Sequence, residues 1–503
     1  MKYKIEKIKT LGELKSGGYK PRSIKDEMRE NLIHQLKNNS RLFEGIIGYN
    51  ETVIPDIETA VLSRHNIILL GLRGQAKTKI ARMMVNMLDE YIPIIAGSEV
   101  NDDPLNPLSR YGIDKVEEMQ DETPIEWISR EARYTEKLAT PDVTIADLIG
   151  DVDPIKAASL KLPYSDERVI HFGLIPRSHR GIFVINELPD LQARIQVALF
   201  NILQEKDVQI RGFKIRLPLD VQFVFTANPE DYTNRGSIVT PLKDRIDSQI
   251  LTHYPRTIHE SKEITSQEAK LTDEQTKSIN APELIKDLIE HVAFEARESE
   301  YVDSKSGVSA RLTISAYENL ISTAERRTLI NNETETTLRI SDFVGVIPSI
   351  TGKVELVYEG EQEGPAKVAQ ILIGKAIKNQ FVSLFPSPEK IKRTKEENPY
   401  HEIIHWFSHG NTIDIISNLS NKDYKKLLCG VPGLSALVNK YYPNEDEESK
   451  FILMEFVLHG LAEHSLLSKD HIEFGLQFKD MLTSMFTMKP DDENFEEDDD
   501  YKY

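Results

Sequence analysis

The residues best suited to chemistry in this sequence form a glycine-containing loop after a short apolar run. Residues 66–80 read NIILLGLRGQAKTKI, which is close to the pattern G-x-x-x-x-G-K-[ST]. In such a strand–loop–helix segment, successive backbone N–H groups surround phosphate groups. Lys77 would reach the β- and γ-phosphates, and the Thr78 hydroxyl would bind Mg²⁺. Ala76 departs from the pattern, because it stands where the last glycine is expected.

Two further apolar runs end in polar side chains that fit phosphate chemistry. The run GIFVINE, residues 181–187, ends in Asn186 and Glu187, and Glu187 is well placed in sequence to polarise an attacking water. The run VQFVF is followed by TANP, in which Asn228 could orient the same water by hydrogen bonding. Each feature taken alone also fits a plainer interpretation, an exposed glutamate at a strand end or an Asn-Pro turn.

The elements that must position these residues are predicted from hydrophobic periodicity. From about residue 41 to Pro255, short apolar runs alternate with helical stretches, which is the pattern of a parallel sheet covered by helices. From Glu283 onward the apolar spacing is helical. We predict strands near Ile67–Leu70, Ile92–Ile95, Ile182–Ile185, Gln222–Phe225 and Gln249–His253.

Composition limits the class of protein. The chain has 503 residues, with 62 Lys and Arg against 81 Asp and Glu, for a formal net charge of −19. This balance argues against broad nucleic-acid binding, which needs cations to neutralise phosphates. A single cysteine, Cys429, excludes an intramolecular disulfide. There is no secretory signal and no apolar run near the ~20 residues that span a bilayer, so we expect a cytoplasmic protein without a membrane span.

The ordered set of motifs from Ile46 to about Ile350 resembles the AAA+ ATPases, especially the clade of MoxR proteins and magnesium chelatase ATPase subunits. The resemblance depends on segments that follow one another along roughly 300 residues. They are IIGYNETVIPDI, GLRGQAKT, VIHFGLIPRSHRGIFVINELPDL, DVQIRGFKIRLPLDVQFVFTANPEDY, PLKDRID and SARLTISAYENL.

The resemblance implies a role for each motif residue. Asn186 and Glu187 occupy the Walker B positions, with Asn186 holding Mg²⁺ through a water, and Asn228 matches sensor 1. Arg245 corresponds to the arginine finger offered to the neighbouring subunit, and Arg311 to sensor 2 on a helical lid. The Walker A loop and the segment before it would bind ATP through Ile47, Gly48, Gly71, Arg73, Gly74, Gln75, Ala76, Lys77, Thr78 and Lys79.

The resemblance also implies a domain organisation and partners. Inserts are expected at Leu160–Val169 and, as a β-hairpin, at Gln209–Arg216. We expect a homo-oligomeric ring, with six subunits the first expectation, that remodels a protein client or inserts a metal or cofactor into it. Many clade members act with a von Willebrand factor A domain protein. The predicted parts are an N-terminal extension (1–40), an α/β ATPase core (41–260), a helical lid (261–358), a loop, helix and linker (359–399), a C-terminal helical domain (400–488) and a disordered acidic tail (489–503).

Asn186 is the departure from the family pattern that matters most for activity. The family usually has Asp at this position, where its negative charge holds a Mg²⁺-bound water. An amide can accept a hydrogen bond from that water but supplies no charge. One alternative is therefore a nucleotide-binding switch with weak or no hydrolysis.

Three other functions are alternatives to an AAA+ ATPase or nucleotide-binding switch. His401, Glu402 and His405 form a formal H-E-x-x-H, which on a helix could bind zinc for proteolysis. The longer form of that motif fails, and an amphipathic helix with Ile404, Trp406 and Phe407 buried explains the same residues. A sigma-54 type transcriptional activator would carry a GAFTGA-like loop, which the sequence lacks. Magnesium chelation proper would need companion subunits and a porphyrin.

Overall fold

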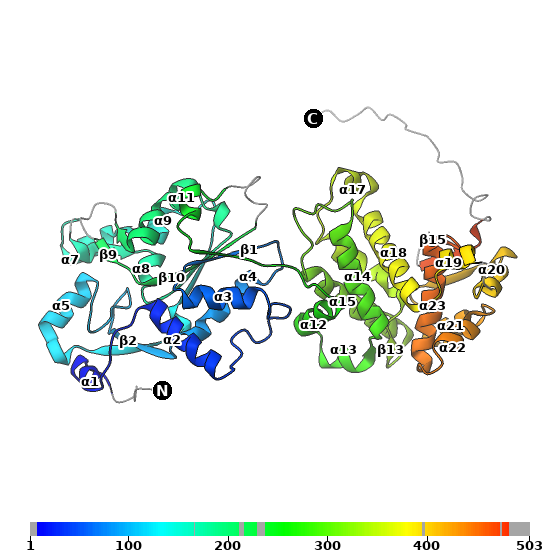
Figure 1. Cartoon of the computed structure of the whole chain (residues 1–503), viewed down its shortest axis with the longest axis horizontal. Helices are drawn as coiled ribbons and strands as arrows, with labels where there is room; N and C mark the ends of the chain where they lie inside the picture. The colour runs from blue at the N-terminus through cyan, green and yellow to red at the C-terminus, as the bar shows by residue number, and fades with distance from the viewer. Residues whose placement is uncertain are drawn as a thin grey trace, which may run out of the picture. The chain divides into compact units, whose positions relative to one another are not determined.

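The computed structural model describes residues 8–164, 166–210, 216–228, 237–394, 398–472 and 475–481. The chain divides into two compact units, Met1–Arg256 and Thr257–Tyr503 (Figure 1). Within the described residues, no helix is both long and apolar enough to cross a membrane.

A five-stranded parallel sheet forms the centre of the first unit. Its strand order is β11-β1-β10-β7-β4, and every neighbouring pair is parallel. The middle strands are apolar and buried on both faces, as expected when helices cover a parallel sheet. The parallel sheet flanked by helices is thereby confirmed. The strands are β1 (Ile67–Leu70), β4 (Tyr134–Leu138), β7 (Gly181–Asn186), β10 (Val221–Ala227) and β11 (Ser248–Leu251).

One predicted strand lies outside this sheet, and one strand of the sheet was not predicted. The apolar run at Ile92–Ile95 does form a strand, β2 (Tyr91–Ile95), but β2 pairs antiparallel with β3 (Ile125–Ser129) in a separate two-stranded sheet. The edge position beside β7 belongs instead to β4, whose sequence YTEKL is only partly buried. An edge strand needs less apolar surface, so hydrophobicity alone did not reveal it.

Helices cover both faces of the central sheet because its side chains alternate between them. Ile67 and Leu69 pack with the apolar residues of α2 (Ile24–Lys37), α3 (Val53–Leu62) and α4 (Lys77–Met83). Ile68 and Leu70 pack on the opposite face with α9 (Ala193–Glu205). Within α2, Ile24, Met28 and Leu32 are buried, so this part of the N-terminal segment belongs to the core of the first unit.

The two segments that were predicted as inserts both lie in the first unit. Strands β8 (Asp207–Gln209) and β9 (Arg216–Pro218) pair antiparallel, with Gln209 opposite Arg216, as predicted for the β-hairpin. The hairpin tip lies outside the described residues. The other insert region holds α7 (Pro154–Leu160) and the 3-10 turn η5 (Glu167–Val169).

The second unit is mostly helical around one continuous apolar core that extends from Ile279 to Phe478. Its C-terminal part also contains a three-stranded antiparallel sheet in the order β14-β16-β15, which the sequence analysis did not identify. The elements used below are α14 (Glu283–Glu298), α15 (Arg311–Asn331), η7 (Ile340–Val346), α16 (Ile347–Thr351), α18 (Pro365–Leu384), α20 (His401–Ser408), α23 (Glu447–Glu463), β14 (Ile413–Ile416), β15 (Ser468–Ile472) and β16 (Gly475–Lys479).

The segment Glu359–Pro365, predicted as a loop, is mostly the short helix α17 (Tyr358–Glu363). Its glutamates and glutamine are good helix formers. The glycines and the proline of the segment favoured a loop in the sequence-based prediction. The helix ends at Gly364, whose φ of 85° is in the left-handed region that glycine adopts readily, and α18 begins at Pro365.

Candidate functional site

The residues of the β1 loop, Asn228 and the Asn186-Glu187 pair, all predicted to take part in phosphate chemistry, lie at one edge of the central sheet. Parallel strands end at the same edge, and the register aligns Leu70 at the end of β1 with Ala227 at the end of β10. The next strand, β7, is aligned with β10 through Ile185 and ends at Asn186. The loop after β1, Asn228 and the Asn186-Glu187 pair therefore follow three adjacent strands.

The loop between β1 and α4 contains two residues with positive φ. Gly74 has φ 77°, and Ala76, the residue before α4, has φ 55° and ψ 14°. A left-handed conformation disfavours any residue with a Cβ, by about 1–2 kcal/mol. This explains why the pattern has glycine where this chain has Ala76, and shows that the loop keeps its left-handed turn without it.

Gly71 is required by close packing at the start of the loop. A Cβ on Gly71 would lie 1.9 Å from Thr252 Oγ1 and 2.1 Å from Gln75 Oε1. These two atoms are joined by a hydrogen bond, in which the Thr252 hydroxyl donates to Gln75 Oε1 over 2.6 Å. Thr252 follows β11 and fixes the loop from the neighbouring strand, a contact that the sequence analysis missed.

The Lys77 ammonium is directed back into the loop. Its Nζ donates to the carbonyl oxygens of Gly71 and, over 3.1 Å, Leu72, and the residue is only 8% exposed. The cation is thus held inside the backbone turn where phosphate oxygens would be bound. Thr78 follows it in α4 and is partly exposed, while Lys79 Nζ donates to the Gly45 carbonyl over 3.3 Å.

The segment before α3 lies against this loop. The Tyr49 hydroxyl lies 2.6 Å from the His253 carbonyl oxygen and 3.2 Å from that of Gln75, and burial raises the pKa of Tyr49 to about 12. Ile47 and Gly48, predicted to contact the nucleotide, precede Tyr49 and are partly exposed. The exposed residue Arg73 of the loop accepts a hydrogen bond at its carbonyl from Tyr254 Oη, 2.9 Å away.

Asn186 is buried, and both the nitrogen and the oxygen of its side-chain amide form hydrogen bonds. Its Nδ2 donates to Glu136 Oε1 over 2.7 Å, and its Oδ1 accepts from the Thr226 hydroxyl over 3.1 Å. Only 6% of the residue is exposed. Thr226, one residue before the end of β10, also accepts from the Glu187 backbone N–H over 3.1 Å and so links β10 to both predicted Walker B positions.

Glu136, on β4, supplies the negative charge beside Asn186, and sequence analysis gave no indication of it. Arg82 of α4 binds both of its carboxylate oxygens, from Nε over 2.8 Å and from Nη2 over 3.1 Å, and Tyr134 Oη donates over 3.0 Å. Burial acts to raise the pKa of Glu136. The hydrogen bonds from Arg82, Tyr134 and Asn186 outweigh burial and hold that pKa below its usual value.

Glu187 has a strained backbone at the end of β7. Its φ of 54° and ψ of 52° are left-handed, although it is not glycine. Such conformations are found where the surrounding structure enforces them, often at functional sites. The side chain is partly exposed, and Asn228, after β10, is 7% exposed.

The two predicted arginines lie in different units. Arg245 follows α11 (Thr240–Lys243) in the first unit, where its Nε donates to Gln204 Oε1 over 2.9 Å and its Nη1 donates to the Pro241 carbonyl over 2.7 Å. Its side chain is partly exposed. Arg311 is the first residue of α15 in the second unit and is exposed.

The H-E-x-x-H segment lies on α20, with Ile403 and Phe407 buried and both histidines exposed. The rings of His401 and His405 lie on one face, with centroids 5.7 Å apart. Across the parts of the chain that the structure describes, no group of three or more His, Cys, Asp or Glu side chains could hold a metal ion. Among the described residues, these histidines therefore have no third ligand of that kind.

Comparisons with known proteins support an AAA+ domain in the first unit. The family model of the sigma-54 interaction domain, an AAA+ domain, matches residues 164–249. Solved structures with a similar fold include the complex of magnesium chelatase subunits BchI and BchD (18% identity, 64% of this chain and 98% of that chain, TM-score 0.32). Others are NtrX from Brucella abortus (12%, 79% and 72%, 0.34) and Hsp104 bound to ATPγS and casein (12%, 66% and 52%, 0.37).

Proposed function

We propose that this chain is an AAA+ ATPase that binds Mg-ATP at the loop after β1 and hydrolyses it. The observation that carries the proposal is the meeting of three adjacent strand ends, which bear the phosphate-type loop, Asn228 and Glu187. Open α/β sheets bind ligands at this edge. The spacing of the motifs in the sequence and the order of the strands in the sheet both favour a nucleotide site at this edge of the sheet.

Each residue then has a specific role in the proposed reaction. The Lys77 ammonium exchanges the carbonyls of Gly71 and Leu72 for phosphate oxygens, which are stronger acceptors because they are charged. Thr78 and Asn186 would hold Mg²⁺, which would supply positive charge to neutralise the phosphates. Glu187 takes the proton of the attacking water, and Asn228 orients that water.

Further roles follow from the resemblance to the MoxR and magnesium chelatase clade and belong to the proposal. Arg245, partly exposed and hydrogen-bonded at its Nε and Nη1, would act on the nucleotide of a neighbouring subunit in a homo-oligomeric ring. Arg311 would report the nucleotide state from the lid. The ring would remodel a protein client, with a von Willebrand factor A domain protein as its expected partner.

The hydrogen bonds of Asn186 favour a second candidate, a nucleotide-dependent switch with little hydrolysis. Its amide oxygen already accepts from Thr226, and Glu136, the carboxylate that its amide nitrogen contacts, is paired with Arg82. The site therefore offers Mg²⁺ less negative charge than an aspartate would, which slows phosphate transfer without removing the binding loop.

The match at residues 164–249 favours a third role, contact with a sigma-54 type transcription factor. The absence of a GAFTGA-like loop from the sequence opposes it. Co-purification of the chain with purified sigma-54 in the presence of ATP and a transition-state mimic would test this role directly.

Steady-state turnover of Mg-ATP by the full chain tests the main proposal. We expect Lys77→Ala to abolish turnover and Glu187→Gln to abolish turnover while ATP still binds. Lys15→Ala, a change at an exposed lysine paired with Asp121, should behave like the unaltered chain. Tight ATP binding without turnover would support the switch. Absence of ATP binding in the unaltered chain would overturn both.

A further inference from the structure

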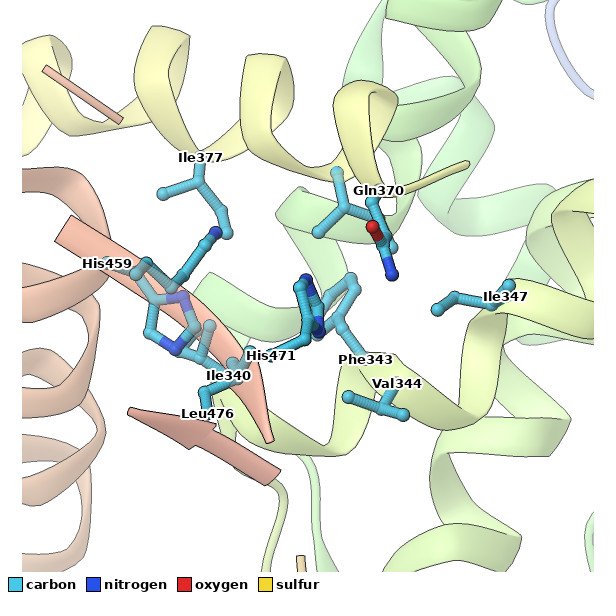
Figure 2. Close-up of a pocket in the computed structure, with 11 residues that line it drawn as sticks. Ile340, Phe343, Val344, Ile347, Gln370, Ile377, His459, His471 and Leu476 are labelled. Atoms are coloured by element: carbon cyan, nitrogen blue, oxygen red, sulfur yellow. The ribbon is translucent and has the colours of Figure 1, made fainter. Parts of the chain in front are cut away.

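Polar side chains line part of a cavity in the second unit, among η7, α16, α18, α23, β15 and β16 (Figure 2). Charged groups of the same unit lie beside them. Lys469 forms an ion pair with Glu463, and Glu455 Oε1 lies 3.8 Å from His459 Nε2. Burial lowers the pKa of His459 and of His471, which disfavours their charged forms. The lining therefore does not favour a ligand of either charge. In the first unit, by contrast, one carboxylate fixes the direction of a chain of hydrogen bonds.

Glu136 and Asn186 lie diagonally on one face of the central sheet. The register places Glu136 opposite Val184, and Asn186 is two residues further along β7, so its side chain is on the same face. Val184 packs in the same apolar cluster as Ile80 and Ala81 of α4. Glu136 and Asn186 are thus on the face of the sheet that α4 covers.

The same helix, α4, contains Thr78, which is proposed to hold Mg²⁺. Arg82, which binds both oxygens of Glu136, follows Thr78 by four residues. Residues four apart lie on the same side of a helix, about 6 Å apart along its axis. Arg82 therefore holds Glu136 beside the turn of α4 that follows Thr78, while Glu136 also contacts Asn186, the other residue proposed to hold the ion.

The hydrogen bond between Glu136 and Asn186 has one chemically possible direction. A carboxylate paired with an arginine only accepts hydrogen bonds, whereas a side-chain amide donates from its nitrogen and accepts at its oxygen. The nitrogen of Asn186 must therefore face Glu136 Oε1, 2.7 Å away. Its oxygen then faces the Thr226 hydroxyl, which donates to it over 3.1 Å.

The direction set by Glu136 continues to the backbone of Glu187. The Thr226 hydroxyl uses its hydrogen for Asn186, and its oxygen accepts from the Glu187 backbone N–H over 3.1 Å. A reversed Asn186 amide would place its oxygen against the carboxylate of Glu136 and turn its NH₂ group toward Thr226. Asn186 is only 6% exposed, so water could not replace the hydrogen bonds that this reversal would break.

We infer that Glu136 is a positioning residue of the proposed Mg-ATP site, where it orients the Asn186 amide with its oxygen directed away from β4. The inference rests on the proposed function. The oxygen that accepts from Thr226 has a second lone pair with which it can serve a cation, whereas an NH₂ group has none. Glu136 thereby gives Asn186 the polarity that an aspartate would have at this position. Partners of metal-binding residues typically contribute roughly 10–100-fold to metal affinity.

The effect of magnesium on nucleotide affinity tests this role without relying on turnover. The dissociation constant of ATPγS for the full chain is measured in EDTA and in excess MgCl₂, and the ratio of the two is the magnesium effect. Glu136→Gln keeps the shape of the side chain but adds an NH₂ group, so the Asn186 amide can reverse. We expect the magnesium effect to fall about tenfold in this variant, while affinity in EDTA stays within about twofold.

Tyr134→Phe is the matched control, because Tyr134 Oη donates to Glu136 Oε2 and not to the oxygen that Asn186 contacts. This variant removes one hydrogen bond from the same carboxylate but leaves it an acceptor, so its magnesium effect should stay within about twofold of that of the unaltered chain. The double variant Asn186→Asp, Glu136→Gln exchanges the carboxylate and the amide. It should recover the magnesium effect that Glu136→Gln loses.

Four results would contradict the role of Glu136. A magnesium effect in Glu136→Gln within about twofold of that of the unaltered chain would overturn it, and so would equal losses in Glu136→Gln and Tyr134→Phe. If Glu136→Gln does not fold, the double variant decides, because a smaller magnesium effect than in the unaltered chain would overturn the inference. Tight ATPγS binding by the unaltered chain without any magnesium effect would overturn the inference but not nucleotide binding. No ATPγS binding by the unaltered chain would overturn the proposed function as well.

Discussion

The side-chain amide of Asn186 donates to the Glu136 carboxylate over 2.7 Å, joining the last residue of β7 to the edge strand β4. Asn186 therefore does more than stand in for an aspartate. It is the donor that a neighbouring carboxylate requires, and its oxygen accepts from Thr226 at the same time. The carboxylate that Asn186 contacts belongs to Glu136, which has Arg82 as its counter-ion.

Asn186→Asp should destabilise the first unit by about 2 kcal/mol, because it removes a buried donor and places two carboxylates together. The double variant Asn186→Asp, Glu136→Gln restores one donor and one carboxylate and should recover most of that loss. Urea denaturation of the four members of this cycle measures the coupling. Additive effects in the cycle would contradict the proposed interaction.

Ala76→Gly should stabilise the first unit by about 1 kcal/mol. Glycine adopts the left-handed conformation of this position without a Cβ penalty, which more than offsets its greater freedom in the unfolded chain. Ala81→Gly, in the interior of the same helix, is the control and should destabilise by about 1 kcal/mol or more. The same sign for both substitutions would show that the backbone at Ala76 is not strained.

Buried strands and local loops could be predicted from the sequence because their signals are local. Strands β1, β7, β10 and β11 coincide closely with apolar runs, and the glycine-containing spacing after β1 placed the phosphate-type loop. Strand β4 could not be predicted in this way. Its sequence YTEKL is polar, and its pairing with β7 depends on residues about 50 positions away.

The hydrogen-bond partners of the site residues could likewise not be predicted from the sequence. The contact between Asn186 and Glu136 joins residues 50 positions apart, and that between Thr252 and Gln75 joins residues 177 apart. No spacing rule in one sequence relates such positions. In the second unit, β15 reads SKDHI, and its register with β16 rather than its hydrophobicity makes it a strand.

Arg245→Ala should lower ATP turnover by about 10³-fold or more while ATP affinity stays within about twofold, because an arginine supplied by a neighbour acts mainly on the transition state. Arg64→Ala, at an exposed surface arginine, is the control. Mixing Arg245→Ala subunits with Glu187→Gln subunits gives a sharper measurement. If Arg245 acts across an interface, the mixture should regain turnover at sites that combine intact Glu187 with a neighbour's intact Arg245. No recovery would place Arg245 in its own subunit's site.

The stability of the first unit should fall on mild acidification because of His179. This residue is 7% exposed, its Nδ1 accepts a hydrogen bond from the Asp220 backbone N–H over 3.0 Å, and burial lowers its pKa to about 4. An unfolded histidine has a pKa of about 6.5, so the unfolded chain binds the proton first. The contribution of neutral His179 is present above that value and is lost as pH falls from about 6.5 to about 4.

Between pH 7 and pH 5 this loss should reach about 2 kcal/mol. His179→Asn keeps an acceptor for the Asp220 N–H but cannot be protonated, so the variant should lose that much less over the same interval. Trp127 in β3 reports on the first unit when Trp406 of the second unit is replaced by Phe. Urea titrations in that background give the free energy of unfolding at each pH. Parallel pH dependences in the two proteins would mean that His179 is protonated equally well in the folded and unfolded chain.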